Sequence, residues 1–255
     1  MAYEKQGFHS GEKLKASQLS AMEDGIIEAE KLAMEGAAGA ANMEKGAGEN
    51  ATQQLPDGVA DGFDLTEKNA NATALDPTLT GIIPYGATGD FASAFGGKCA
   101  AMGKRSHAEG TSTIAKGKYS HAEGDNSVAL GNDSHAEGYQ TVTGPDATAQ
   151  HAEGIRTQAL GWAAHAEGSD TVAKGNNSHA GGSHTVANHN DQTVIGKYNK
   201  NKENTLFEVG NGVDADHKSN AFEVYEDGDI GIYKDGKIYS LQKMLAAYFT
   251  DENLK

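Results

Sequence analysis

The sequence predicts a mainly β protein whose central part is a parallel β-solenoid of 14-residue coils. The word HAEG or HAGG recurs with its histidine at positions 107, 121, 135, 151, 165 and 179, at spacings of 14, 14, 16, 14 and 14. A second word ending in glycine, such as TIAKG or SVALG, falls midway between copies. A glycine every seven residues would cost a helix about 1 kcal/mol each, whereas coils of strand, turn, strand and turn accommodate it. The repetition therefore predicts stacked coils over residues 87–199.

The one longer interval contains TGPDATAQ, residues 143–150, in which the second word degrades and Pro145 enters. We expect a two-residue bulge or loop there.

Side-chain alternation predicts which residues face the inside of the roll. Residues two apart on a strand share one face, and each word keeps an alanine with Ser or Thr two residues before it in most copies. We therefore expect Ala, Ser and Thr to fill a narrow interior. The outward face of one strand then carries a ladder of histidine and glutamate: His107, Glu109, His121, Glu123, His135, Glu137, His151, Glu153, His165, Glu167 and His179.

The other strand of each coil presents an aliphatic stripe outward. Its members are Ile114, Val128, Leu130, Leu160 and Val172. An alanine-lined roll buries little apolar area, which is worth about 25 cal/mol per Å². Exposed apolar stripes usually mark interfaces, and cyclic symmetry is a common form of closure. The sequence therefore predicts a homotrimer in which sister chains cover the stripe.

Composition and charge exclude several classes of function. The 255 residues carry a formal charge of -15, which argues against binding nucleic acid or anionic membranes. The only cysteine, Cys99, excludes an intrachain disulfide framework. The start lacks the apolar core of a signal peptide, and no apolar run reaches membrane-spanning length. We expect a soluble product of the bacterial cytoplasm without membrane insertion.

The segments that flank the repeats predict different structures. Residues 1–45 are expected to be an attachment segment with a trimeric helix, because Leu19, Met22 and Ile26 have the spacing of a short coiled-coil seam. A single amphipathic helix packed on a neighbour is the alternative. Residues 46–86 show no period and are expected to be an irregular connector with short strands. Residues 200–255 predict strands joined by Asp-Gly turns, followed by a short helix over 241–249.

The histidine and glutamate ladder raises the question of chemistry. His-x-Glu on a strand places both side chains on one face, which suits a metal ion. However, each rung supplies only two ligands, and catalysis needs one asymmetric site, whereas this pair recurs along the array. We therefore expect a hydrogen-bonded, partly ionised outer ladder. A metal site and a catalytic site are the alternatives, and we assign no metal, cofactor or catalytic residue.

The repeat words resemble a known family. SVALGNDSHAEG and TVAKGNNSHAGG resemble the left-handed parallel β-roll head of trimeric autotransporter adhesins, and the SHAEG variant is similar to repeats in tail fibre and baseplate proteins of bacteriophages. The stretch LKASQLSAMEDGI, residues 14–26, resembles the amino-terminal segment of phage baseplate and receptor-binding proteins. The segments NTLFEVGNG and SNAFEVYEDG look like stretches common in phage structural proteins.

The resemblance implies a non-enzymatic, homotrimeric host-attachment component of a phage tail or a phage-derived injection particle. It would join other tail or baseplate proteins through its amino end, reside in the virion tail and bind a host cell-surface glycan or protein. The alternative is the passenger fragment of a trimeric autotransporter adhesin. A sugar-cleaving tailspike needs a cleft with paired carboxylates, which so regular an array does not offer.

Overall fold

The computed structural model describes residues 44–46, 52–54, 62–66, 68–234 and 237–249. The chain divides into two units, residues 1–43 and 44–255, and the described residues all belong to the second. The predicted amino-terminal helix with Leu19, Met22 and Ile26 lies outside the described residues. Within these ranges, no helix is long and apolar enough to cross a membrane.

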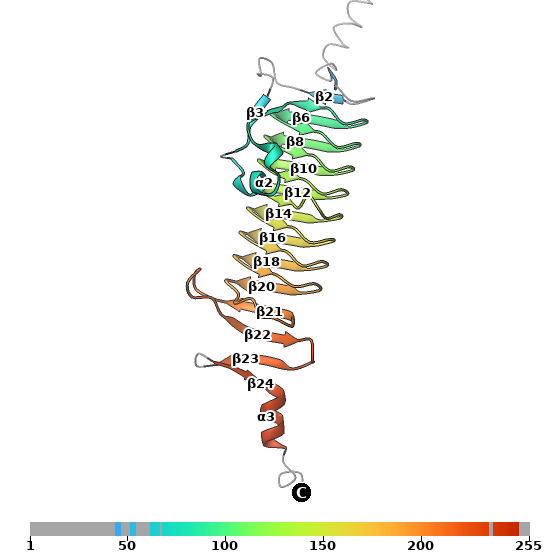
Figure 1. The fold of residues 1–255 in the computed structure, drawn as a ribbon. Helices are drawn as coiled ribbons and strands as arrows, with labels where there is room; N and C mark the ends of the chain where they lie inside the picture. The colour runs from blue at the N-terminus through green and yellow to red at the C-terminus, as the bar shows by residue number, and fades with distance from the viewer. Residues whose placement is uncertain (1–43, 47–51, 55–61, 67, 235–236, 250–255) are drawn as a thin grey trace, which may run out of the picture. The chain divides into compact units, whose positions relative to one another are not determined.

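The centre of the fold is a stack of coils, each formed by one two-residue strand and one five-residue strand (Figure 1). The five-residue strands are β6 (Ser93–Gly97), β8 (His107–Thr111), β10 (His121–Asp125), β12 (His135–Tyr139), β14 (His151–Ile155), β16 (His165–Ser169), β18 (His179–Ser183) and β20 (Thr193–Lys197). The two-residue strands are β5 (Gly86–Ala87), β7 (Ala100–Ala101), β9 (Ile114–Ala115), β11 (Val128–Ala129), β13 (Val142–Thr143), β15 (Gln158–Ala159), β17 (Val172–Ala173) and β19 (Val186–Ala187). The prediction of a mainly β solenoid is confirmed, while its left-handed sense and the trimer stay predictions.

Strand pairing follows the repeat. Each five-residue strand pairs in parallel with the next, so that His121 lies opposite His135 and Ala122 lies opposite Ala136. His135 in turn lies opposite His151, so the 16-residue interval leaves the register intact. The extra residues are taken up between β13 and β14, where the buried Gln150 donates from Nε2 to the carbonyl oxygen of Gly144 at 2.9 Å.

Alanine fills the interior, as the alternation predicts. The repeated alanine position is fully buried in eleven copies: Ala108, Ala115, Ala122, Ala129, Ala136, Ala152, Ala159, Ala166, Ala173, Ala180 and Ala187. The serine before the HAEG word is also buried and serves the turn. Ser106, Ser120 and Ser134 each donate from Oγ to the carbonyl oxygen of the glycine three residues earlier, at 2.7 Å. Small side chains thus allow the two strands of a coil to lie close together.

Two glycine positions set the distance between coils. Gly124 has φ +98°, and a Cβ built on it would lie 2.1 Å from the carbonyl oxygen of Gly138 in the next coil. A Cβ on Gly117 would lie 1.8 Å from the carbonyl oxygen of Gly131. No L side chain fits at such distances, so glycine is required for the coils to stack.

The turns also use left-handed backbone at residues other than glycine. Tyr119, Asn126 and Asp133 have φ of 58°, 57° and 53°, and this conformation recurs about every seven residues. In each case the left-handed residue lies two positions after the glycine of the repeat word. In each Gly-x-x turn, the glycine thus lets the backbones of neighbouring coils approach closely. The third residue adopts the left-handed conformation that reverses the chain.

Residues 62–66 and 68–84, which we call the covering segment, pack on the flank of the first coils (Figure 1). The segment contains β3 (Gly62–Asp64), α2 (Ala70–Leu75), the 3-10 helix η1 (Pro77–Leu79) and β4 (Ile82–Pro84). Asn69 caps α2 by accepting a hydrogen bond from the Ala72 amide at 3.1 Å. Two further short strands, β1 (Glu44–Lys45) and β2 (Thr52–Gln54), precede it, and β2 pairs in parallel with β6.

The covering segment corrects one prediction. The repeat words predict that sister chains hide the aliphatic stripe, but Ile114, Val128 and Leu130 are already buried, with 5% exposure or less. Leu65 and Leu79 of the covering segment belong to the same apolar cluster. These three stripe residues therefore have little surface left for a trimer contact. Leu160 and Val172 remain half-buried, and their role in a trimer stays a prediction.

The segment is also fastened by polar contacts. The Lys116 ammonium contacts the Asp76 carboxylate and donates to Thr78 Oγ1 at 2.7 Å. The Asn69 side chain donates to the carbonyl oxygen of Asn126 at 2.7 Å. The described part of the connector that the sequence predicts is thus attached to two coils.

Beyond β20 the solenoid gives way to an antiparallel extension. β21 (Thr205–Asn211) still pairs in parallel with β20, whereas β22 (Asn220–Tyr225), β23 (Ile230–Lys234) and β24 (Lys237–Ser240) are antiparallel. The described chain ends in α3 (Leu241–Tyr248), capped by Ser240. The predicted terminal strands and short helix are confirmed.

Candidate functional site

The His–Glu ladder, which runs from His107 to His179 on strands β8 to β18, is the most regular array of titratable groups in the described residues. Alternation along each strand directs the alanine inward and the histidine and glutamate on either side of it outward. The histidine side chains are 33–37% exposed, so the ladder lies on the surface but is shielded by its own neighbours. All eleven predicted ladder residues are brought together by the parallel register.

The imidazole rings form a continuous stack. Ring centroids of successive histidines lie 4.6–5.0 Å apart. The rings from His121 to His165 are nearly parallel, with interplanar angles of 2–3°, while the two outermost pairs are edge-on. The spacing follows from the distance of about 4.8 Å between hydrogen-bonded strands.

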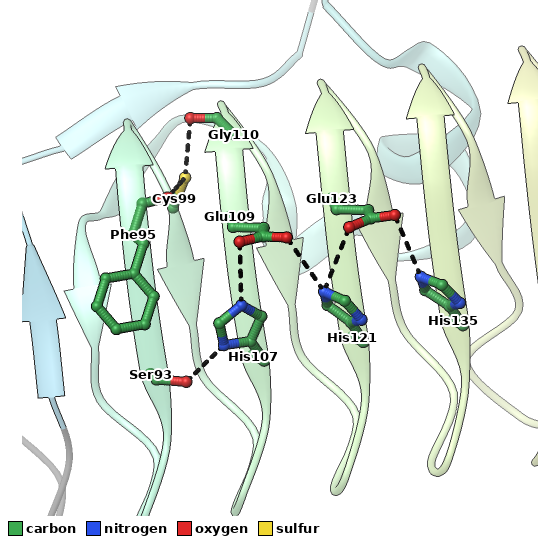
Figure 2. A network of polar contacts seen from close by, with 9 residues as sticks. All are labelled: Ser93, Phe95, Cys99, His107, Glu109, Gly110, His121, Glu123 and His135. Carbon is green, nitrogen blue, oxygen red and sulfur yellow. Dashed lines mark hydrogen bonds and ion pairs between the residues drawn. The ribbon is translucent and has the colours of Figure 1, made fainter.

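Each glutamate lies between the histidine of its own rung and that of the next rung. Glu109 is 3.5 Å from His107 Nε2 and 4.0 Å from His121 Nε2, and Glu123 is 3.8 Å from both His121 and His135 (Figure 2). The contact to the next rung shortens to 3.4 Å for Glu137. Carboxylate and imidazole atoms therefore alternate along the ladder.

The lower rungs continue this trend. The contact to the next histidine is 3.3 Å from Glu153 to His165 and 3.1 Å from Glu167 to His179. At the upper end, the Ser93 hydroxyl lies 2.6 Å from His107 Nδ1 and fixes the first ring (Figure 2). Ser93 was not predicted, although it occupies the histidine position of the preceding coil.

Burial governs the electrostatics of the histidines. Desolvation lowers the pKa of His121, and the neighbouring imidazoles of His135 and His107 lower it further. The pKa of His135 and the pKa of His165 are lowered in the same way, first by burial and then by adjacent histidines. These imidazoles are therefore held in the neutral form that coordinates metals.

Several ring nitrogens have no hydrogen-bond partner. Nε2 of His121, His135, His151 and His165 is shielded from solvent and makes no hydrogen bond within the described part of the chain. Buried polar atoms are normally satisfied, so each of these atoms calls for a partner. Among the residues that the structure describes, four sets of three side chains could hold an ion, with the ligand atoms of each set within 4.8 Å of one another. They are His107/Glu109/His121, His121/Glu123/His135, Glu137/His151/Glu153 and Glu153/His165/Glu167.

The remaining surface bears exposed aromatic side chains at the edges of the coils. Tyr119, Tyr139 and Trp162 are 50%, 41% and 53% exposed. Arg105 lies over the rings of Phe91 and Tyr119 at 5.4 and 5.8 Å, so these turns form a short mixed row. Flat aromatic surfaces with nearby polar groups suit recognition of sugars or proteins. The row forms because Phe91, Arg105 and Tyr119 occupy the same repeat position, two residues after a glycine, in three successive coils.

Stacked 14-residue coils around an alanine interior define a β-solenoid repeat protein. Two stretches of the chain, residues 122–142 and 152–178, match the YadA head domain repeat. The matched stretches lie within the coils that carry the His–Glu ladder, and they support the adhesin-like head expected from the repeat words. Comparison with curated proteins and with solved structures gave no match.

Proposed function

We propose that the chain is a non-enzymatic attachment protein whose solenoid is the head of a homotrimeric fibre. The observation that carries the proposal is the pair of matches to the YadA head domain repeat, in coils that present continuous rows of side chains to the outside. A row of equivalent positions repeated along a stack suits binding to an extended surface, because each coil adds a similar contact. The partner would be a glycan or protein on a host cell surface.

The half-buried part of the aliphatic stripe supports the trimer. Leu160 and Val172 of the stripe, and Val186 in the coil after Val172, lie below the covering segment and are only half-buried. Covering such a stripe with two further chains would stabilise an alanine-lined roll that has little apolar area of its own. Sedimentation velocity of the purified chain is expected to give a single trimeric species. A folded monomer at the same concentrations would overturn the trimer.

Two cellular settings suit this head. The stretch of residues 14–26 resembles baseplate and receptor-binding proteins, which favours a phage tail or a phage-derived injection particle whose other proteins bind the amino end. The repeat match favours a bacterial surface adhesin of the trimeric autotransporter type at least as well. We propose a phage-type particle, with virion-tail localisation, as the first setting to test.

Mass spectrometry of particles purified from the producing cells separates the two settings. Presence of the chain in tail particles at stoichiometric amounts supports the phage setting, whereas recovery in the outer-membrane fraction supports the adhesin. For attachment itself, binding of the labelled chain to host cells is expected to fall when Tyr119 and Trp162 are both replaced by Ala. Replacing the exposed Val213 by Ala is the control. Equal binding by all three proteins would remove the aromatic edge from the proposal.

A further inference from the structure

The carboxylates of the His–Glu ladder are in register, and in the described residues no lysine or arginine side chain forms an ion pair with them. Glu123, Glu137, Glu153 and Glu167 lie directly opposite one another on adjacent strands. Within the described residues, the basic side chains that pair with them are histidines alone. Like charges directly opposite on neighbouring strands destabilise a sheet. The ladder therefore has a negative row that favours a bound cation.

The ring nitrogens that face this row are also unsatisfied. Nε2 of four histidines makes no hydrogen bond in the described part of the chain, although each lies within 4.0 Å of a carboxylate oxygen. Two ligands bound about 2.1 Å from one ion at angles of 90–110° are roughly 3.0–3.5 Å apart. The Glu137–His151 and Glu153–His165 separations of 3.4 and 3.3 Å fall in this range. Nitrogen and oxygen are thus placed as neighbouring ligands of one ion.

A shallow groove beside the carboxylates leaves room for the water ligands of a bound ion. It has a volume of about 540 Å³ and is lined by Glu109, Glu123, Glu137 and Glu153 together with the glycine that follows each of them. Because these glycines have no side chain, the carboxylates border open space on that side. A protein site with three ligands and one open position is a common arrangement for zinc.

From these observations, we propose that the His–Glu ladder binds divalent zinc or a similar first-row transition metal ion along its length. Each ion takes imidazole Nε2 and carboxylate oxygen ligands from two successive rungs. Imidazole ligands favour these metals over Mg²⁺ and Ca²⁺, which prefer sites made of oxygen atoms. The ions bridge strands from different coils, so they neutralise the carboxylate row and tie the coils together.

The four sets of ligands predict the number of ions. The two upper sets share His121 and the two lower sets share Glu153, so each pair holds one ion when every residue supplies one ligand atom. The upper and lower sets have no residue in common. Two ions are therefore expected on the ladder. His179 adds none, because Gly181 stands where the other rungs have glutamate.

Isothermal titration of the full-length chain with ZnCl₂ tests the proposal. The wild-type chain is expected to take up two ladder ions. His121→Ala removes both upper sets and Glu153→Gln removes both lower sets, so each variant should lose one ion and the double variant should lose two. His217→Ala is the matched control, because His217 is exposed and lies off the ladder beside Asp214. Circular dichroism establishes that each variant keeps the β-solenoid.

Two further measurements keep the outcome clear. Co²⁺ bound in place of Zn²⁺ should give visible d–d bands that disappear in the double variant. A large excess of Mg²⁺ should leave Zn²⁺ binding unchanged. The proposal is overturned if the folded double variant binds as many ions as the wild type, or if Mg²⁺ displaces Zn²⁺, which would indicate condensation on the carboxylates alone.

Discussion

The upper (amino-terminal) and lower (carboxyl-terminal) halves of the solenoid in Figure 1 carry the same repeat, but their flanks have different surroundings. Val128 on β11 is fully buried, while Val172 at the equivalent position on β17 is half-buried. The difference comes from the covering segment, whose Leu65 and Leu79 belong to the cluster around Val128. Burial of a repeat position is therefore decided by what packs on it and not by the repeat word. The lower flank remains the part available to another chain.

The spacing of the coils, in contrast, is the same in both halves. Gly124 and Gly168 have φ of +98° and +99°, and a Cβ on either would lie 2.1 Å from a carbonyl oxygen of the next coil. Gly124→Ala and Gly168→Ala are therefore expected to destabilise the solenoid more than any substitution on its flanks. Each should lower the free energy of unfolding by about 3–5 kcal/mol, measured by chemical denaturation.

Gly97→Ala is the control for these two variants, since its Cβ would first meet Thr111 Oγ1 at 3.9 Å. It should leave the unfolding free energy almost unchanged. A large loss in Gly97→Ala, or none in Gly124→Ala, would contradict the close-approach explanation.

A valine-to-alanine substitution at the equivalent position on each flank tests the difference between the two flanks. Val128→Ala should lower the free energy of unfolding by about 2 kcal/mol, because it leaves a cavity in an enclosed cluster. Val172→Ala should have less than half that effect in a monomeric state. If trimerisation covers the lower flank, Val172→Ala should instead weaken the trimer, so sedimentation at several concentrations must accompany the unfolding curves. Equal losses in both variants, without a change in assembly, would show that the flanks are alike.

The contact between Lys116 and Asp76 fastens the covering segment to the upper flank. Burial alone would raise the pKa of Asp76, but hydrogen bonds from Lys116 and Thr78 lower it overall. Since the folded pKa lies below the ordinary value, the contribution is present at neutral pH and is lost as the pH falls through that lowered value. Lys116→Met should cost below about 1 kcal/mol at pH 7, and the difference from wild type should shrink under acidic conditions. A difference that grows with acid would have the wrong sign.

The smallest effect on stability is expected from removing an exposed ion pair on the lower half of the solenoid. Arg156 makes two contacts of 2.7 Å with the Asp170 carboxylate, but its side chain is 44% exposed. Arg156→Gln should shift the unfolding midpoint slightly, and added salt should remove the difference because exposed ion pairs are screened. A shift that persists at high salt would show that the guanidinium has a packing role.

Much of the fold followed from the repeat. The 14-residue period predicted the parallel register of His121 with His135, and alternation predicted that alanine lines the interior. The sequence also placed the histidines and glutamates together on one outer face. It did not indicate that four Nε2 atoms lack hydrogen-bond partners in the described residues, because that depends on ring orientation and on distances between rungs.

Residue size, alternation and glycine spacing determine the structure within one or two repeats. The local geometry of each coil could therefore be derived from the amino-acid sequence. The cover on the upper flank could not, because it arises from packing between distant segments. Its residues show no period, and their burial depends on the contact of Leu65, Leu79 and Asp76 with coils that lie far along the chain. A repeat reports the contacts that each copy makes with its neighbours, whereas a contact made once, by a segment outside the repeat, leaves no periodic signal in the sequence.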